Sequence, residues 1–178
     1  MPTTAKTKTK KTADRKARNA KSNQTRSNKA AMNAIDLLEQ DHREVEAYFD
    51  QFEGLKDDAA KNDLARKICM ALTVHTRIEE EVFYPQARDA IEDDDLLDEA
   101  LVEHDGAKKL IAEIEEMEAG EELFDAKVKV LGEMIRHHVE EEEEELFPEV
   151  EKSEMDLETV GKQMAQRKAE LMTEMERA

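Results

Sequence analysis

The chain contains little of what builds sheets, disulfides or membrane spans. Its 178 residues include five glycines, three prolines, one cysteine and no tryptophan, and only 4% are aromatic. So few glycines and prolines leave little material for the turns of a sheet protein, while abundant Ala, Leu, Met, Glu and Lys favour helices. The lone cysteine, Cys69, has no partner for an internal disulfide, so we expect a small buried thiol. The composition predicts an all-α protein.

Long apolar runs are also missing. No segment has the length of a transmembrane helix or the form of a signal-peptide core. We therefore expect a cytoplasmic protein that does not bind membranes. The start of the chain, rich in Lys, Thr and Ala, is a weak match to an organellar transit peptide, because its arginines are few and it has no visible apolar face.

The chain has two regions of opposite net charge. Residues 1–30 carry seven Lys and three Arg against one Asp, a net charge of +9, so the remainder carries −27 to reach the total of −18. With almost no large apolar side chains, residues 1–30 cannot bury enough surface to offset their ordering entropy, which predicts a disordered basic tail. Such a tail suits a nucleic acid or another polyanion, or it serves only as a solubilising segment.

The acidic body shows helical periodicity from Met32 onward, with breaks at 54–58, 92–95 and 119–121. Four helices joined by short breaks predict an antiparallel, up-down-up-down four-helix bundle over residues 31–152. A C-terminal amphipathic helix is predicted over 153–178, with Ser153 and Asp156 as its capping signal. Its methionine-rich stripe should pack across the bundle or against a second chain.

An internal repeat relates the two halves of the body. DHREVEAYF and VHTRIEEEVFYP in the first half correspond to EHDGAKKLI and HHVEEEEEELFP, 62 to 63 residues later. Counted back from the prolines that close the second motifs, His75 corresponds to His138, and Glu79 to Glu142. The neighbouring pair His137 and Glu141 has the same spacing, shifted by one residue, and is the alternative assignment. We expect His137 to be exposed, or to contact a metal ligand without binding the metal itself.

Each of the four helical segments has an apolar stripe that is interrupted by histidine, or by histidine and glutamate. The stripes are Ile35, Leu38, His42, Val45, Phe49 and Phe52; Leu64, Ile68, Leu72, His75, Glu79 and Val82; Leu97, Leu101, His104, Ile111 and Ile114; and Leu131, Ile135, His138, Glu142 and Leu146. Four histidines and two glutamates are therefore predicted to point into an apolar interior.

Buried carboxylates need compensation, because an unpaired one costs several kcal/mol or takes up a proton. No Lys or Arg lies on the central part of these stripes, whereas imidazoles do, and imidazoles with carboxylates suit a transition metal. Four His and two Glu exceed the needs of one structural zinc but suit two ions that share two carboxylates. We expect two non-haem Fe ions, with Mn and Zn ranking below iron.

The order His, His-x-x-x-Glu, His, His-x-x-x-Glu, with the endings EEEVFYP and EELFP, resembles the hemerythrin HHE cation-binding family over about residues 33–150. The resemblance implies a four-helix bundle with a di-iron centre that binds dioxygen or a related small oxidant. It also implies that Glu79 and Glu142 bridge the ions. The implied ligands are His42, His75, Glu79, His104, His138 and Glu142.

One position departs from the family pattern. The oxygen-carrying hemerythrins have a further histidine four residues after the third-helix ligand, where this chain has Lys108. One iron should then have a ligand fewer, which argues against simple reversible oxygen carriage. We expect the other glutamates of 140–145 to form a solvated helix face, with one of them or His137 as a possible substitute ligand. Tyr48 and Tyr84 should serve in packing, with radical relays near an oxidising centre as the alternative.

The predicted function is that of a di-iron protein that binds dioxygen, nitric oxide or peroxide for sensing, buffering or protection against oxidative stress. A redox enzyme that turns over peroxide or nitric oxide is the alternative, although no second cofactor motif is present. A third possibility is an iron-holding or structural metal protein that its basic tail directs to nucleic acid. The chain is expected to be a monomer or a homodimer.

Overall fold

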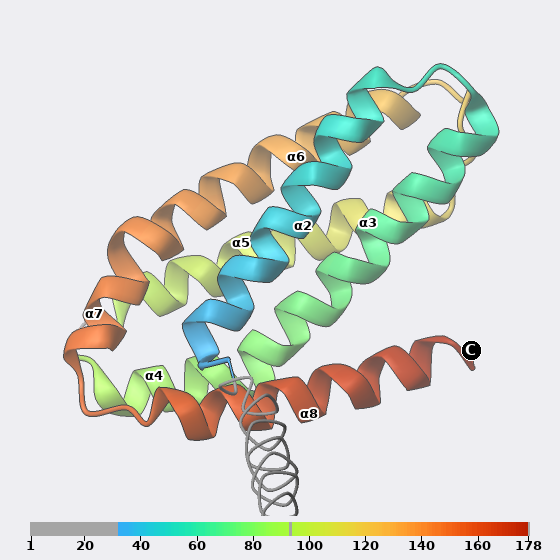
Figure 1. Ribbon diagram of the computed structural model, residues 1–178. Helices are drawn as coiled ribbons and strands as arrows, with labels where there is room; N and C mark the ends of the chain where they lie inside the picture. Colours follow the sequence, from blue (N-terminus) through green and yellow to red (C-terminus); the bar gives the residue numbers. More distant parts are fainter. Residues whose placement is uncertain (1–31, 93, 178) are drawn as a thin grey trace, which may run out of the picture. The chain divides into compact units, whose positions relative to one another are not determined.

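Helices make up the folded body of the chain. The computed structural model describes residues 32–92 and 94–177, and no strand occurs in these ranges (Figure 1). The expected disordered tail, residues 1–30, lies outside them. Four long helices form the bundle: α2 (Ala34–Gly54), α3 (Asp58–Ile78), α5 (Asp95–Glu115) and α6 (Phe124–Glu141). The prediction of an all-α fold is confirmed.

Short connections reverse the chain between neighbouring helices. They fall at 55–57, at 91–92 with 94, and at 116–123, where the sequence predicts breaks. α2 packs against α3 and α6, and α5 packs against α3 and α6, which gives the up-down-up-down arrangement (Figure 1). None of the helices described in residues 32–92 and 94–177 is both long and apolar enough to cross a membrane.

Side-chain caps define where several helices begin. Asn33 accepts a hydrogen bond from the amide of Asp36, and Asp57 accepts one from that of Ala60. These bonds satisfy amides that have no partner in the first turn of a helix.

The last helix begins later than predicted. Its cap is Asp156, which accepts from the amide of Thr159 and starts α8 (Leu157–Met175). The prediction that Ser153 acts as the cap was wrong. The Ser153 hydroxyl instead donates to the carbonyl of Val150 and closes the preceding helix.

Two helices change their pitch at the glutamates of the repeated motif. α3 continues as the π-helical segment η1 (Glu79–Phe83) and then α4 (Tyr84–Ala90), and α6 continues as η2 (Glu142–Leu146) and then α7 (Phe147–Lys152). A π turn accommodates one additional residue, so the buried face advances by one position. Phe83 is consequently fully buried, whereas Val82, which the regular spacing places inward, is only half-buried.

A second stripe residue also differs from the prediction. Leu101 is 37% exposed, and Ala100 takes the core position on α5. The buried face of α5 runs through Leu97, Ala100 and His104, in steps of three and then four residues rather than four and then three.

The core consists of two apolar clusters. One gathers Leu38, Ile78 and Phe83 with residues of α7 and α8, and the other gathers Phe49, Leu72 and further residues of α3, α5 and α6. His42, His75, Glu79, His104, His138 and Glu142 are all buried in the same interior. The bundle therefore encloses a set of polar side chains between the two apolar clusters.

α8 covers α2, α3 and η1 (Figure 1). Val160, Met164 and Leu171 are buried there, so the stripe packs across the chain's own bundle, as the first of the two alternatives predicts. A close approach of backbones makes this possible. A Cβ atom on Gly161 would lie 2.6 Å from the carbonyl oxygen of Met32 and 2.7 Å from the carbonyl carbon of Asn33.

We expect Gly161→Ala to separate α8 from α2 and to lower the free energy of unfolding by about 1–3 kcal/mol, the usual range for overpacking. Urea unfolding followed by circular dichroism measures this change. Gly54→Ala is the matched control, because no atom lies within 4 Å of its added methyl group. An equal loss in both variants would contradict the close approach at Gly161.

Candidate metal centre

Four imidazoles meet in the interior through their Nε2 atoms. The Nε2 atoms of His42 on α2 and His75 on α3 are 3.2 Å apart. Those of His104 on α5 and His138 on α6 are 3.1 Å apart. Each long helix of the bundle thus contributes one histidine, and the four form two pairs.

Two buried glutamates lie between the pairs. Glu79 places one carboxylate oxygen 3.2 Å from Nε2 of His75 and the other 3.4 Å from Nε2 of His104. One oxygen of Glu142 lies 3.3 Å from Nε2 of His42 and 3.5 Å from Nε2 of His138. Each carboxylate therefore faces a histidine of both pairs.

The opposite ring nitrogens face four further carboxylates, none of which the sequence analysis singles out for this role. Nδ1 of His42 lies 2.9 Å from Glu143, that of His104 lies 2.8 Å from Glu80, and that of His138 lies 2.8 Å from Glu103. Asp41 is farther away, with its oxygen 3.7 Å from Nδ1 of His75. A carboxylate on Nδ1 orients the ring and leaves Nε2 free to bind a metal.

These outer carboxylates follow the internal repeat. Asp41 and Glu103 directly precede the histidines of α2 and α5, and Glu80 and Glu143 directly follow the buried glutamates. The doublets Asp-His and Glu-His, and the second glutamate after His-x-x-x-Glu, are therefore the sequence signals that could have identified them. Glu143 is not simply part of a solvated face, as predicted, because it contacts His42.

Carboxylates and imidazoles shift each other's protonation. Burial by itself lowers the pKa of His75, but the carboxylates of Glu79 and Asp41 raise it to about 10. Burial likewise lowers the pKa of His138, which Glu142 and Glu103 raise to about 9. Burial raises the pKa of Glu142, yet His138 and His42 hold it below its usual range. At neutral pH a cation that enters must therefore displace protons from His75 and His138.

The geometry fits metal ions. Two ligands at about 2.1 Å from one ion, separated by roughly 90–109°, lie about 3.0–3.4 Å apart, which matches both Nε2 pairs. Both oxygens of Glu79 and one of Glu142 are buried without a hydrogen-bond partner among the described residues. Such atoms are costly unless something compensates them. Two groups of possible ligands result: His42, His75, Glu79 and Glu142; and Glu79, His104 and His138.

Tyr84 makes the two groups unequal. Its ring stacks on His104 at 5.5 Å between centroids, as Phe147 stacks on His42 at 5.9 Å in the other half. Unlike Phe147, Tyr84 has a hydroxyl, which donates to Glu142 at 2.8 Å and lies 3.3 Å from Nε2 of His104. Burial raises the pKa of Tyr84 well above its ordinary value. Tyr84 is thus more than the packing residue that the sequence predicts.

Lys108 and His137 both lie outside the centre. Lys108 occupies the position of the family's additional histidine and pairs with Glu80, at 2.6 Å and 2.8 Å from its two oxygens. The side chain of His137 is 63% exposed and faces Glu141, whereas the side chain of His138 is 4% exposed. The structure therefore turns His138 inward and His137 toward solvent.

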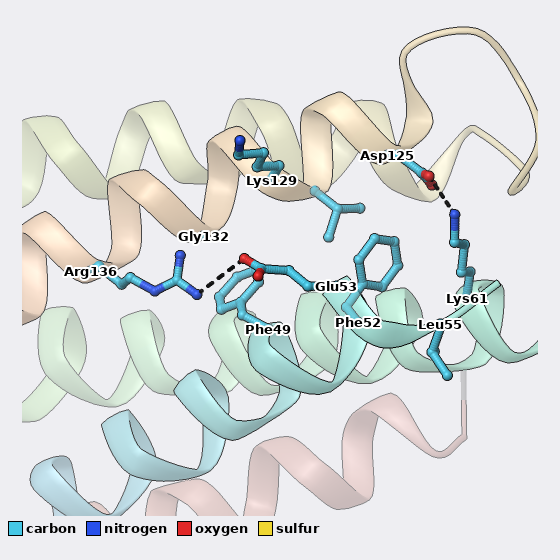
Figure 2. A pocket seen from close by; sticks show the side chains of 10 residues that line it. Phe49, Phe52, Glu53, Leu55, Lys61, Asp125, Lys129, Gly132 and Arg136 are labelled. Carbon is cyan, nitrogen blue, oxygen red and sulfur yellow. Dashed lines mark hydrogen bonds and ion pairs between the residues drawn. The ribbon is translucent and has the colours of Figure 1, made fainter.

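A surface groove elsewhere on the bundle does not share this chemistry. It lies between α2, the start of α3 and α6, with a volume of about 390 Å³ and Phe49, Phe52 and Val128 among its lining residues. Figure 2 shows two pairs of opposite charge at this groove, Lys61 with Asp125 and Arg136 with Glu53.

Comparisons with known proteins agree with this fold. The model of the hemerythrin HHE cation binding domain matches residues 33–150. A crystal structure of a hemerythrin HHE cation binding domain-containing protein from Mycobacterium kansasii has a TM-score of 0.68 at 21% identity, covering 79% of this chain and 87% of that one. A DNA nickase of Nostoc sp. (strain PCC 7120) is 29% identical over 116 residues, which are 65% of this chain and 33% of the nickase. The chain thus spans about a third of that relative's length.

Fold and centre together define a helical bundle whose buried histidines and glutamates suit a cation. The chain belongs to the hemerythrin HHE cation-binding domain family. Membership makes it a metal-binding protein, and the His and Glu clusters mark a suitable site within the bundle.

Removing the Tyr84 hydroxyl should leave Glu142 with one hydrogen bond fewer in the interior. We expect Tyr84→Phe to lower the free energy of unfolding of the chelator-treated protein by about 1–3 kcal/mol, measured by urea titration. Tyr48→Phe removes a hydroxyl that bonds the exposed Glu44 and should change stability by less than about 0.5 kcal/mol. Equal effects would show that the bond to Glu142 contributes nothing.

Proposed function

We propose that this protein is a non-haem di-iron protein that binds dioxygen or a related small oxidant, such as nitric oxide or peroxide, for sensing, buffering or protection against oxidative stress. The observation that carries the proposal is the set of four buried Nε2 atoms around two carboxylates, three of whose four oxygens have no hydrogen-bond partner among the described residues. Paired cations would compensate these charges in place of the protons that His75 and His138 hold.

The proposed ligands divide between two positions. His42 and His75 would hold one ion, and His104 and His138 the other. Glu79, which belongs to both groups, would bridge the ions, and Glu142 lies between His42 and His138 in a position to do the same. Tyr84 could add an oxygen at the second position, where the family's additional histidine is replaced by Lys108.

Iron is the proposed metal because redox-active pairs of ions in helical bundles use mixed imidazole and carboxylate ligands. When bound, the pair would supply electrons and open coordination positions for a small oxidant. The chain's own residues would hold the imidazoles in orientation through the Nδ1 carboxylates, and Tyr84 would hold a proton on its oxygen beside Glu142.

The space beside the centre supports a small ligand. A cavity of about 10 Å³ touches His42, His75 and His138. Its other lining residues are Asp41, Thr76 and four apolar residues of α2, α3 and α6: Val45, Leu72, Ile135 and Val139. This volume is about that of one water molecule, and the atoms that face the cavity are mainly apolar, which gives water few partners. A diatomic molecule or peroxide suits such a space better than an organic substrate does.

A catalytic role is the second candidate. The phenol of Tyr84, 2.8 Å from Glu142, is a proton donor within a hydrogen bond of a proposed ligand, which a redox enzyme acting on peroxide or nitric oxide could use. A visible absorption band that forms when the reduced protein meets oxygen and disappears under vacuum supports binding. Sustained consumption of peroxide supports catalysis. A cytoplasmic location and a monomeric or homodimeric state stay predictions.

His75→Ala tests the proposed ligands. We expect iron to fall from about two ions per chain to near zero, with loss of the visible absorption and a lower melting temperature, because one ion loses a ligand and the shared carboxylates lose their order. Elemental analysis and spectroscopy measure this. His137→Ala removes an exposed histidine from the same protein and should keep the iron. Unchanged iron in His75→Ala would contradict the ligand set.

We also propose that residues 1–30 bind nucleic acid or another polyanion. The support is their charge of +9 in a chain of net charge −18, because clustered Lys and Arg bind phosphates by releasing counterions. The similarity to a protein named DNA nickase is compatible with this proposal, although the matched part is only a third of that protein.

Deleting residues 1–30 should abolish DNA binding while leaving the metal content unchanged. For the full chain, we expect the affinity for a short duplex to fall by roughly 10³-fold or more between 50 and 200 mM salt, measured by fluorescence anisotropy. Binding that survives the deletion would assign DNA recognition to another part of the chain. Binding that does not depend on salt would exclude counterion release as its source.

A further inference from the structure

The four carboxylates on the outer side of the histidines differ in how their own charge is balanced. In three of them a fixed cation completes the arrangement: Lys168 at Asp41, Lys108 at Glu80 and Arg43 at Glu143. The fourth, Glu103, contacts His138 with one oxygen, and its other oxygen lies 3.8 Å from Nε2 of His137. Among the described residues, no Lys or Arg pairs with Glu103.

A second carboxylate adds negative charge beside Glu103. Glu141 lies one helical turn after His137, with its oxygen 3.3 Å from the same Nε2 atom. His137 and Glu141 thus repeat the His-x-x-x-Glu spacing of His138 and Glu142, displaced by one residue, which turns the second pair to the outer face of α6. Glu103, His137 and Glu141 offer three ligand atoms within 4.8 Å of one another.

The cluster opens to solvent on one side and reaches toward the buried centre on the other. Outside it lies a hollow of about 550 Å³, whose lining includes Asp95, Asp98 and Glu99. On the inner side, a cavity of about 10 Å³ touches Glu103, Glu141 and the buried Glu142. Glu103 and Glu141 line both spaces. They therefore stand between the acidic hollow and a proposed ligand of the centre.

We propose that Glu103, His137 and Glu141 bind a divalent transition-metal ion at the surface, and that this site is the outer step of the route by which metal reaches the buried centre. The binding site stands independently of the proposed di-iron function, whereas its role in the route rests on that function. The ion takes the place that Lys or Arg occupies at the other three outer carboxylates.

The chemistry of the cluster selects the class of ion. One imidazole with two carboxylates suits first-row divalent metals, whereas Ca²⁺ and Mg²⁺ prefer oxygen ligands alone. Three ligands on an exposed face leave positions for water, so an ion can bind there and leave again. The acidic hollow raises the local concentration of cations, which accelerates their capture.

Zinc binding to the full chain tests the site itself. With iron filling the buried centre, calorimetry should detect one additional Zn²⁺, and a zinc-soaked crystal should show its anomalous peak between His137 and Glu141. We expect His137→Ala and Glu141→Gln each to weaken this binding by about tenfold or more. Glu144→Gln removes the same charge from an exposed position outside the cluster and should change the affinity by less than about threefold.

The outcomes separate this site from the buried centre. Zinc that binds equally well to His75→Ala supports a surface site independent of the di-iron proposal, even if that proposal fails. Absence of an additional zinc ion, unchanged affinity in His137→Ala, or equal losses in Glu144→Gln and Glu141→Gln would each overturn the site.

Iron uptake tests the route. When Fe²⁺ is added to metal-free full chain, we expect His137→Ala to fill the buried centre about tenfold more slowly, yet to the same final iron content as the wild type. Glu144→Gln should fill at the wild-type rate. Uptake at an unchanged rate in His137→Ala would reject the route, and zinc binding at the surface would then define an isolated site.

Discussion

The structure depends on the compensation of two carboxylates that lie inside an apolar bundle. Glu79 and Glu142 are 0% and 2% exposed, and three of their four oxygens have no hydrogen-bond partner among the described residues. Four imidazole nitrogens face them, but at neutral pH only the protonated ones offset their charge. Because these carboxylates and imidazoles lie between apolar clusters, a cation that neutralises the carboxylates also stabilises the packing of all four helices. Binding of metal and stability of the fold are therefore expected to be coupled.

The internal repeat explains how so many charged groups can share one interior. Consecutive residues on a helix point about 100° apart, so an acid beside a ligand points toward a neighbouring helix. Asp41 and Glu103 use this offset to face the histidines of α3 and α6, and Glu80 and Glu143 use it to face those of α5 and α2. A short motif, repeated twice, thus specifies both the inward groups and the groups that orient them.

Sequence periodicity predicted the helices, the antiparallel bundle and the inward direction of the histidines, because these follow from a spacing of 3.6 residues per turn. It did not predict features that depend on irregular helical turns or on contacts between helices. The π turns at Glu79 and Glu142 shift the buried face by one residue, which brings Phe83 inward in place of Val82. The contact of Tyr84 with Glu142 joins two helices, and pairings between helices depend on tertiary packing.

The halves agree in their inward groups and diverge in what surrounds them, and this divergence gives the centre two different sides. Phe147 stacks on His42, and a small cavity whose surface is mainly apolar touches His42, His75 and the inner side of His138, a surrounding that favours a small neutral molecule. At the Nδ1 atom of His138, by contrast, Glu103 leads to an acidic hollow, a surrounding that favours a cation. Under the proposed function, a small oxidant and the metal need not compete for one path. A symmetric duplication would offer both the same surroundings, so the substitutions that break the repeat are where this chain's own specificity should reside.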